Sequence, residues 1–411
     1  MKVNGIIAEY NPFHNGHQYQ LKESLRRTGA KYTIVVMSGN FVQRGAPALV
    51  GKFRRAEMAL HNGADLVLEL PTLYSTSSAE YFATGAVVLL DRLGVVDNLC
   101  FGSESGDADL LKQIAEILLE EPEEYKKSLK QYLKQGLSYP NARNDALIQN
   151  YPSLGQHKNV FSSPNNILGI EYIKAILRLN IPMKPVTVQR LGAGYHSRLP
   201  EGAPCSAMAI RQALYSGADA TFLKDNMPQN AAQILASRLP KSGPVNSNDF
   251  SDILYYKLTM ERDQGFEKYL DVSTALSDRI CSHLDDYRCF DNFCDTLKTK
   301  DMTYTRISRC LLHIMLDIKK VDMERAKIMG TVPYARVLGF RKSAEPLLGE
   351  IKLHSSIPLV TKPADAEKLL DRDAYSMLRQ DMQCAQIYRG VASRRIGITP
   401  NNEISTPLVI L

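Results

Sequence analysis

No two cysteines of this sequence are spaced as Cys-x-x-Cys, and the seven that it has are scattered irregularly over 411 residues. An odd, irregular set argues against a disulfide framework and against structural zinc. Apolar runs such as residues 86–90 are far shorter than the roughly 20 residues that span a bilayer. The N-terminus also lacks the basic, apolar and small-residue pattern of a secretory signal. We therefore expect a cytoplasmic protein that does not contact membranes.

What the chain does contain is the composition of an ordinary folded protein, with 44% hydrophobic and 23% charged residues. Its length allows two or three domains, each with its own core. The net charge of +6 fits an anionic partner. A surplus of this size is also common in proteins that never bind nucleic acid, so the distribution of charge matters more than its sum.

The first half of the sequence alternates apolar runs with helical patterns, which implies a mostly parallel sheet. Residues from about 107 to 151 interrupt this order with helical spacing and charged faces, and predict a helical insertion. Strand patterns fade after residue 216. The predicted fold class is α/β, with a Rossmann-like parallel sheet in residues 1–216 and a mainly α-helical domain in residues 217–411. The predicted strands are residues 3–8, 32–37, 66–70, 98–101 and 184–189.

The most informative segment follows the first predicted strand, where residues 9–17 read Glu-Tyr-Asn-Pro-Phe-His-Asn-Gly-His. A helix that opens after a tight turn points free N–H groups and a positive dipole end at an anion, and Gly16 lets a ligand approach the backbone closely. His14 and His17 flank that glycine and can reach one phosphate. A His-x-x-His pair alone is often a surface turn, and zinc would need further ligands. Its place at a strand end favours nucleotide binding.

Three more positions fall where predicted strands end, on the same rim of the sheet. Gly102 either presents bare backbone to a base or ribose, or is a simple strand-to-loop glycine. Asn165 is either a helix cap or an amide that reads adenine or ribose. Arg190 needs an anion, and a triphosphate would serve. Lys52 and Arg55 lie near this rim and could meet an RNA.

The segment at residues 14–17 resembles the T/H-x-G-H signature of adenylyl-transferring nucleotidyltransferases. This resemblance implies that His14 and His17 are catalytic and stabilise the transition state at the α-phosphate of ATP. Such enzymes hold the β- and γ-phosphates with a Ser/Thr-rich stretch that ends in Ile-Arg; Ser206 and Arg211 match it, but Met208 replaces a second hydroxyl. The expected ATP-binding residues are Ile7, Ala8, Glu9, Tyr10, Asn11, Pro12, Phe13, His14, Asn15, Gly16, His17, Gln18, Tyr19, Gln20, Gly102, Asn165, Arg190, Ser206 and Arg211.

The match extends further along the chain, through Met-Ser-Gly-Asn-Phe-Val-Gln-Arg-Gly at residues 37–45 and Pro-Tyr-Ala-Arg-Val-Leu-Gly-Phe at residues 333–340. Together with the opening segment these resemble the tRNA(Met) cytidine acetate ligase family. The resemblance implies ATP-dependent activation of acetate to acetyl-adenylate. The acetyl group then passes to the exocyclic N4 amine of the wobble cytidine in elongator tRNA(Met), which gives N4-acetylcytidine. Mg²⁺ would accompany the triphosphate, although no carboxylate cage for a metal is evident, and no protein partner is implied.

The implied chemistry needs positioned donors, because the transition state at the α-phosphate gathers charge on phosphoryl oxygens. Both steps can be direct displacements, so neither requires a nucleophilic serine or cysteine. The cytidine must leave its stack to reach the mixed anhydride, which an anticodon loop permits at low cost.

Basic residues of the second half are candidates for tRNA phosphates, with Tyr304 and Tyr334 as aromatics that could stack on bases. Each of them could equally belong to a solvated face. Two other functions stay open: a metabolic adenylyltransferase acting on a small carboxylate or phosphate, and a non-catalytic nucleotide-dependent binding protein. A basic helical domain counts against the first, and the paired histidines against the second. The expected tRNA-binding residues are Lys300, Arg306, Arg309 and Arg336.

Overall fold

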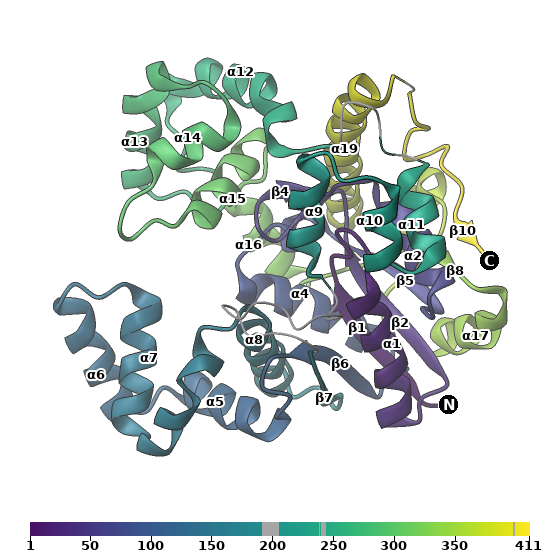
Figure 1. Cartoon of the computed structure of the whole chain (residues 1–411), viewed down its shortest axis with the longest axis horizontal. Coiled ribbons are helices and arrows are strands. Elements are labelled where there is room, and N and C mark those ends of the chain that lie inside the picture. The colour runs from purple at the N-terminus through teal and green to yellow at the C-terminus, as the bar shows by residue number, and fades with distance from the viewer. Residues whose placement is uncertain (191–204, 238, 240–243, 398) are drawn as a thin grey trace.

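The computed structural model describes residues 1–190, 205–237, 239, 244–397 and 399–411, and an eight-stranded sheet forms its centre (Figure 1). The strands are β1 (Val3–Ala8), β2 (Tyr32–Ser38), β5 (Leu66–Leu70), β6 (Asn98–Ser103), β7 (Lys184–Gln189), β8 (Ala335–Phe340), β9 (Leu359–Val360) and β10 (Val409–Ile410). Their order is β10-β8-β5-β2-β1-β6-β7, with β9 beside β8. All pairs are parallel except β5 with β8. The predicted α/β class with a mainly parallel sheet is confirmed.

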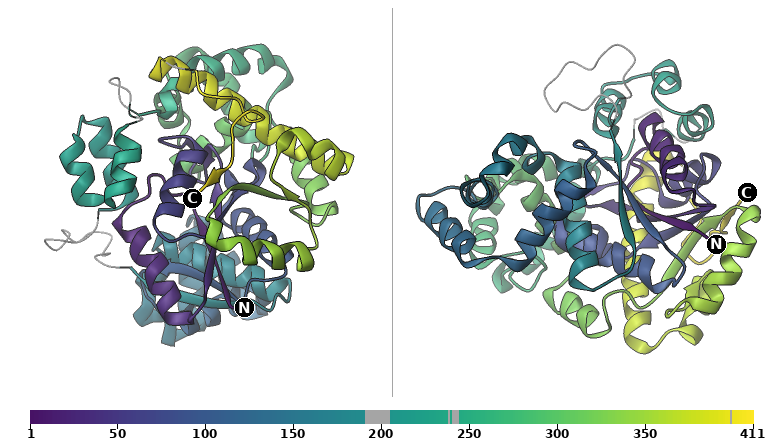
Figure 2. Two further views of the ribbon diagram at one scale, coloured as in Figure 1. Left: turned by 90° about the vertical axis from the view of Figure 1, so that its right-hand side faces the viewer. Right: turned by 90° about the horizontal axis from the view of Figure 1, so that it is seen from below.

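Helices cover both faces of the sheet, which explains why its central strands β1, β2 and β5 are buried along almost their whole length (Figure 2). In β2, Ile34 and Val36 pack on one face, whereas Val35 and Met37 pack on the other. Because side chains of a strand alternate between faces, one run of apolar residues fills two cores. The first core includes α4 (Ala79–Arg92) and α8 (Pro164–Arg178), and the second includes α1 (Asn15–Thr28) and α2 (Lys52–His61).

The strand order creates a binding position at one edge of the sheet. The chain builds outward from β1 through β2 to β5, then crosses to the other side of β1 for β6 and β7. In open α/β sheets ligands bind in the crevice at such a switch point, at the carboxyl ends of the strands. Here that crevice lies beyond the ends of β1 and β6.

Two groups of helices extend away from the sheet in Figure 1. The segment expected as a helical insertion holds α5 (Ala108–Glu120), α6 (Glu123–Lys134) and α7 (Tyr139–Asn150). A second group lies above it in that view. Its members are α12 (Ser251–Glu261), α13 (Thr274–His283), α14 (Phe290–Leu297) and α15 (Tyr304–Met315); the helix that follows them, α16 (Lys320–Ile328), lies beside α4.

The second half of the chain is mainly helical but does not stay apart from the sheet. Asn62 at the end of α2 donates to Asn230 (2.8 Å), which holds the helices before residue 237 against the first half. The chain then returns to the sheet as β8, whose strand pattern is weakened by Arg336 and Gly339. Gly339 is needed there because a Cβ would collide with Val409 of β10. The remaining helices are α3 (Thr72–Ser75), α9 (Ala207–Tyr215), α10 (Ala220–Asn226), α11 (Gln229–Ala236), α17 (Glu345–His354), α18 (Ala366–Leu369) and α19 (Arg372–Ile396).

All seven cysteines are unpaired, in agreement with their irregular spacing. In the part of the chain that the structure describes, no helix is both long and apolar enough to cross a membrane.

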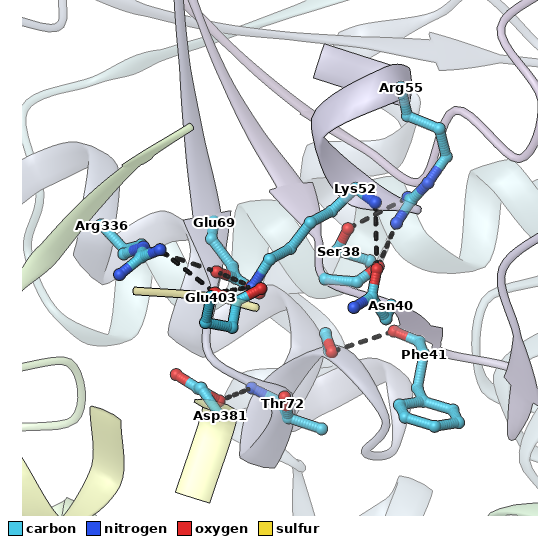
Figure 3. Close-up of polar contacts among 12 residues, drawn as sticks. Ser38, Asn40, Phe41, Lys52, Arg55, Glu69, Thr72, Arg336, Asp381 and Glu403 are labelled. Carbon is cyan, nitrogen blue, oxygen red and sulfur yellow. Dashed lines mark hydrogen bonds and ion pairs between the residues drawn. The ribbon is translucent and has the colours of Figure 1, made fainter. Parts of the chain in front are cut away.

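A buried cluster of four charges joins β5, α2, β8 and the end of the chain (Figure 3). Lys52 Nζ lies 2.7 Å from Glu69 and 2.9 Å from Glu403, and Arg336 lies 3.1 Å from Glu403. Two cations face two carboxylates, so the cluster has no net charge. Because only 2% of its side chain is exposed, Arg336 cannot meet tRNA, and that expectation is wrong. Lys52 is equally buried, so its expected contact with RNA is wrong as well.

We predict that Glu403→Ala lowers the free energy of unfolding by about 3 kcal/mol, because it leaves two buried cations with one carboxylate. Urea unfolding followed by circular dichroism measures this loss. Glu350→Ala is the matched control, since Glu350 pairs with His354 on the exposed surface and should change stability little. A Glu403→Ala protein as stable as the control would show that the cluster is not structurally important.

Candidate active site

A cavity of about 830 Å³ opens at the carboxyl edge of the sheet, and a hollow of about 30 Å³ adjoins it. The two share His14, Gln20, Gly102 and Arg190 in their walls. Most of the residues expected from sequence therefore meet at one place. The expected residues that line these cavities are Ile7, Ala8, Glu9, Tyr10, Asn11, His14, Gly16, His17, Tyr19, Gln20, Gly102, Asn165, Arg190, Ser206 and Arg211.

The other four expected ATP-binding residues, Pro12, Phe13, Asn15 and Gln18, do not line either cavity in the described structure. Phe13 is fully buried in the core against Tyr10, at 4.8 Å between ring centroids. Asn15 Nδ2 donates to the Asp225 carbonyl (3.2 Å), and Gln18 donates to Asn62 (2.9 Å). The helical period of α1 turns these side chains toward neighbouring helices, away from the strand ends.

His14 and His17 form a capping arrangement at the start of α1. His14 Nδ1 accepts from the Gly16 N–H (3.0 Å), and His17 Nδ1 accepts from the His14 N–H (3.3 Å). In a neutral imidazole the other nitrogen then carries the proton. Backbone hydrogen bonds therefore fix both rings as Nε2–H donors. The rings stack with centroids 3.8 Å apart, so both donors serve one small region.

The glycine between the histidines is required by His14 itself. A Cβ at Gly16 would lie 2.8 Å from His14 Cε1, which no side chain can accept without moving the ring. The H-x-G-H spacing thus allows the ring of the first histidine to pack against the first turn of the helix that it caps.

Both imidazoles stay neutral at physiological pH. Burial, with the charges of Arg190 and Arg211, lowers the pKa of His14 to about 3. Burial and the neighbouring His14 hold the pKa of His17 well below its usual range. The pair can therefore donate hydrogen bonds to an anion without first carrying charge.

Three arginines bring positive charge to the cavity: Arg44, Arg190 and Arg211. Arg211 also donates to the Asn11 carbonyl (2.6 Å), so that α9 is tied to the turn after β1. Ser206 is the N-cap of α9 and accepts from Ala209 N (3.2 Å). Its hydroxyl is thus partly engaged, and Met208 lines the cavity beside it.

Asn165 does not cap α8, so that interpretation is wrong; Ser163 occupies the N-cap position. Asn165 Nδ2 instead donates to Glu104 (2.6 Å), and the Asn166 N–H donates to the other oxygen of the same carboxylate (3.0 Å). Glu104 therefore sits on the N-terminus of α8, where the helix dipole favours negative charge.

Sequence reasoning missed an apolar wall of the cavity. Its residues come from α4, β6 and α8, and in sequence they cannot be told from ordinary core residues. Position at a strand end was the one available signal, and it applies only to Phe101, the last residue of the predicted strand 98–101. The wall consists of Ala79, Phe82, Phe101, Ile167, Leu168 and Tyr172.

Arg55 anchors the turn that precedes the two histidines through hydrogen bonds to backbone carbonyls. Its guanidinium donates to the carbonyls of Glu9 (2.6 Å), Ser38 (3.0 Å) and Val50 (3.0 Å), and it also reaches the carbonyl of Gly39. Burial lowers the pKa of Arg55 to about 10. Because the side chain is fully buried, its expected contact with RNA is wrong, and it supports the site from within the fold.

Residues 1–399 match the family described as HIGH Nucleotidyl Transferase. The chain belongs to this family. This chain is 42% identical over 390 residues to the tRNA(Met) cytidine acetate ligase of Halothermothrix orenii, and the match covers 93% of this chain and 92% of the relative. With the ligase of the same name from Clostridium kluyveri it is 42% identical over 416 residues, covering 100% and 99%.

Two crystal structures of Thermotoga maritima TmcAL have the same fold as this chain over its whole length. One, bound with alpha-thio ATP, has a TM-score of 0.90 at 32% identity, and the apo form has 0.91 at 33%; each comparison covers 100% of both chains. The resemblance seen in the sequence, to the tRNA(Met) cytidine acetate ligases, is therefore confirmed.

We predict that the wild-type protein loses about 2 kcal/mol more stability than His14→Asn when the pH falls from 7 to 5. The folded pKa of His14 is about 3, whereas an unfolded histidine titrates near 6.5, so only the unfolded chain gains this proton in that interval. Stability contributed by the neutral ring is thus lost as the pH falls. Urea unfolding of both proteins at the two pH values measures the difference. Equal losses would contradict the lowered pKa.

Proposed function

We propose that this chain is an ATP-dependent tRNA(Met) cytidine acetate ligase that forms acetyl-adenylate and acetylates the N4 amine of the wobble cytidine of elongator tRNA(Met). The observation that carries the proposal is the pair of fixed Nε2–H donors at the start of α1, inside a cavity of nucleotide size. The full-length relatives named tRNA(Met) cytidine acetate ligase supply the substrate class.

In the first step a carboxylate oxygen of acetate attacks the α-phosphorus of ATP and pyrophosphate leaves. Negative charge builds on the phosphoryl oxygens, and His14 and His17 can donate to them without reorganising. Preorganised donors of this kind typically contribute a factor of about 100 to 1,000 in rate each. Arg190 and Arg211 lie where they can hold the remaining phosphates.

Mg²⁺ would enter with the triphosphate and neutralise part of its charge. Among the described residues no group of three or more His, Cys, Asp or Glu side chains could hold a metal ion. The ion would therefore be held mainly by phosphate oxygens and water, which suits the coordination that Mg²⁺ prefers.

Transfer requires tRNA to reach the cavity from the helices beyond it. Lys300 and Arg306 are exposed near the start of α15, and Lys300 donates to the Gly136 carbonyl of the insertion (2.9 Å). Ser308 of α15 donates to the Gly45 carbonyl (2.8 Å), on the hairpin of β3 (Phe41–Val42) and β4 (Ala46–Pro47). This hairpin carries Arg44 into the cavity, so positive charge continues from α15 to the site.

Two other residues expected on this path have different surroundings. Only 14% of the Arg309 side chain is exposed and it faces Asp271 at 3.8 Å, so it offers less to a phosphate than Arg306 does. Tyr334 is buried and donates to Asp381 (2.6 Å), so its expected stacking on a base is wrong.

We predict that the purified protein incorporates labelled acetate into unmodified elongator tRNA(Met) when ATP is present. His14→Ala should lower acetate-dependent exchange of labelled pyrophosphate into ATP at least about 100-fold, because one phosphoryl donor is lost. A reaction with acetyl-CoA in place of ATP and acetate is the control. Acetylation from acetyl-CoA alone would reject the proposal.

A second test concerns the tRNA path. Lys300→Ala combined with Arg306→Ala should weaken tRNA binding and lower the slope of log K against log salt by about 1 to 2, while pyrophosphate exchange stays near wild type. Filter binding over a range of salt concentrations measures this. Lys352→Ala with Lys368→Ala removes the same charge near α17 and α18 and should leave the slope unchanged. Equal effects of the two pairs would exclude a path along α15.

A further inference from the structure

The cavity holds two carboxylates whose surroundings differ. Among its described lining residues, the acidic ones are Glu9 and Glu104. Both oxygens of Glu104 accept hydrogen bonds at the start of α8. Glu9 accepts a hydrogen bond at one oxygen alone among the described residues, although a negative charge in a site for a triphosphate is unfavourable. Its side chain is unsuited to a phosphate, even though its backbone belongs to the ATP-binding turn.

Glu9 is held in place but keeps one oxygen free. Its carbonyl accepts from Arg55 (2.6 Å), and its Oε1 accepts from the Gln43 N–H (3.0 Å). Within the described residues, Oε2 takes no hydrogen bond and the carboxylate forms no ion pair. The side chain is therefore a fixed carboxylate with an available acceptor on the cavity wall.

The cavity that Glu9 lines also has an apolar wall. Phe101 and Tyr172 pack edge to face with ring centroids 5.6 Å apart, and both line the cavity. Glu9 and Tyr172 line the same cavity, and the charge of Glu9, together with burial, raises the pKa of the Tyr172 hydroxyl. An apolar wall beside a carboxylate suits a planar base with an edge amine better than it suits a phosphate.

We propose that Glu9 accepts the proton that the cytidine N4 amine loses during acetyl transfer, an inference that rests on the proposed function. The N4 nitrogen attacks the acetyl carbonyl carbon and a C–N bond forms. The bond from that carbon to the bridging oxygen breaks, and AMP leaves with its electron pair. The proton of the amine passes to Glu9 Oε2, so atoms and charge balance without another reactant.

The other groups of the site cannot take this proton as easily. His14 and His17 already carry a proton on Nε2, and their Nδ1 atoms accept backbone N–H groups. Glu104 is engaged at both oxygens. Arginines are donors only. Glu9 is thus the acceptor that remains among the described residues of the cavity.

Glu9→Gln is a sharp test, because its amide oxygen can still accept from the Gln43 N–H while the charge and basicity disappear. Two steps are measured separately: acetate-dependent pyrophosphate exchange for adenylate formation, and single-turnover transfer from preformed acetyl-adenylate to tRNA. We expect transfer to fall about 100-fold, the usual contribution of a general base, and to fall much further than exchange does. Glu9→Asp, which keeps a carboxylate, should recover part of the transfer rate.

Each alternative gives a different result. Equal losses in both steps, with a higher Mg²⁺ concentration needed for exchange, would overturn the inference and make Glu9 a metal or ATP contact. A loss that follows weaker tRNA binding would assign it to recognition, which also overturns the inference. Wild-type transfer by Glu9→Gln would overturn it outright. Failure of the wild-type protein to acetylate tRNA would instead reject the proposed function.

Discussion

Two backbone-to-imidazole hydrogen bonds at the start of α1 determine what this site can do. The N–H groups of Gly16 and His14 occupy the Nδ1 atoms of His14 and His17, and this leaves both protons on Nε2. A helix terminus normally offers its free N–H groups to an anion directly. Here two of them act through imidazoles, which carry the donor function further into the cavity. The low pKa of each ring follows from the same burial.

That terminus must be held still, and the support comes from groups that are themselves buried. The Arg55 guanidinium donates to four backbone carbonyls from three separate segments of the chain, and so ties these segments together. A single carboxylate partner would tie Arg55 to only one segment. Three residues away, Lys52 belongs to the charge cluster that includes Glu69, Arg336 and Glu403. The last residues of the chain thereby stabilise the helix that carries Arg55. A loss of packing far from the cavity is thus expected to reach the histidines through α2.

Sequence patterns predicted those elements whose signal is local and continuous. The predicted bounds of β1, β5 and β7 match the structure, and the strand-end rule brought Gly102 and Arg190 to the histidines. Strand β8 was missed because contacts with distant parts of the chain explain its two unusual residues. Arg336 is paired with Glu403 in the core, and Gly339 leaves room for Val409 of β10.

For the same reason several functional guesses failed. Charge in a sequence does not tell whether a side chain is solvated or paired inside the fold. We expected Arg336 and Lys52 to contact RNA, because the sequence does not show that both pair with Glu403, which is far away in the chain. Likewise the apolar wall of the cavity is indistinguishable from core until the sheet is assembled.

The distribution of charge around the cavity separates two tasks that one site must perform. In the proposed reaction, cations from the hairpin, the end of β7 and α9 would hold the phosphates, and the neutral imidazoles would serve the reacting centre. A free carboxylate among those cations would weaken phosphate binding if it faced them alone. Glu9 shares its cavity wall with apolar side chains as well, and its charge acts on Tyr172 and on Arg211. The same position suits an amine that must lose a proton, and the geometry thus reconciles an anionic substrate with a base in one cavity.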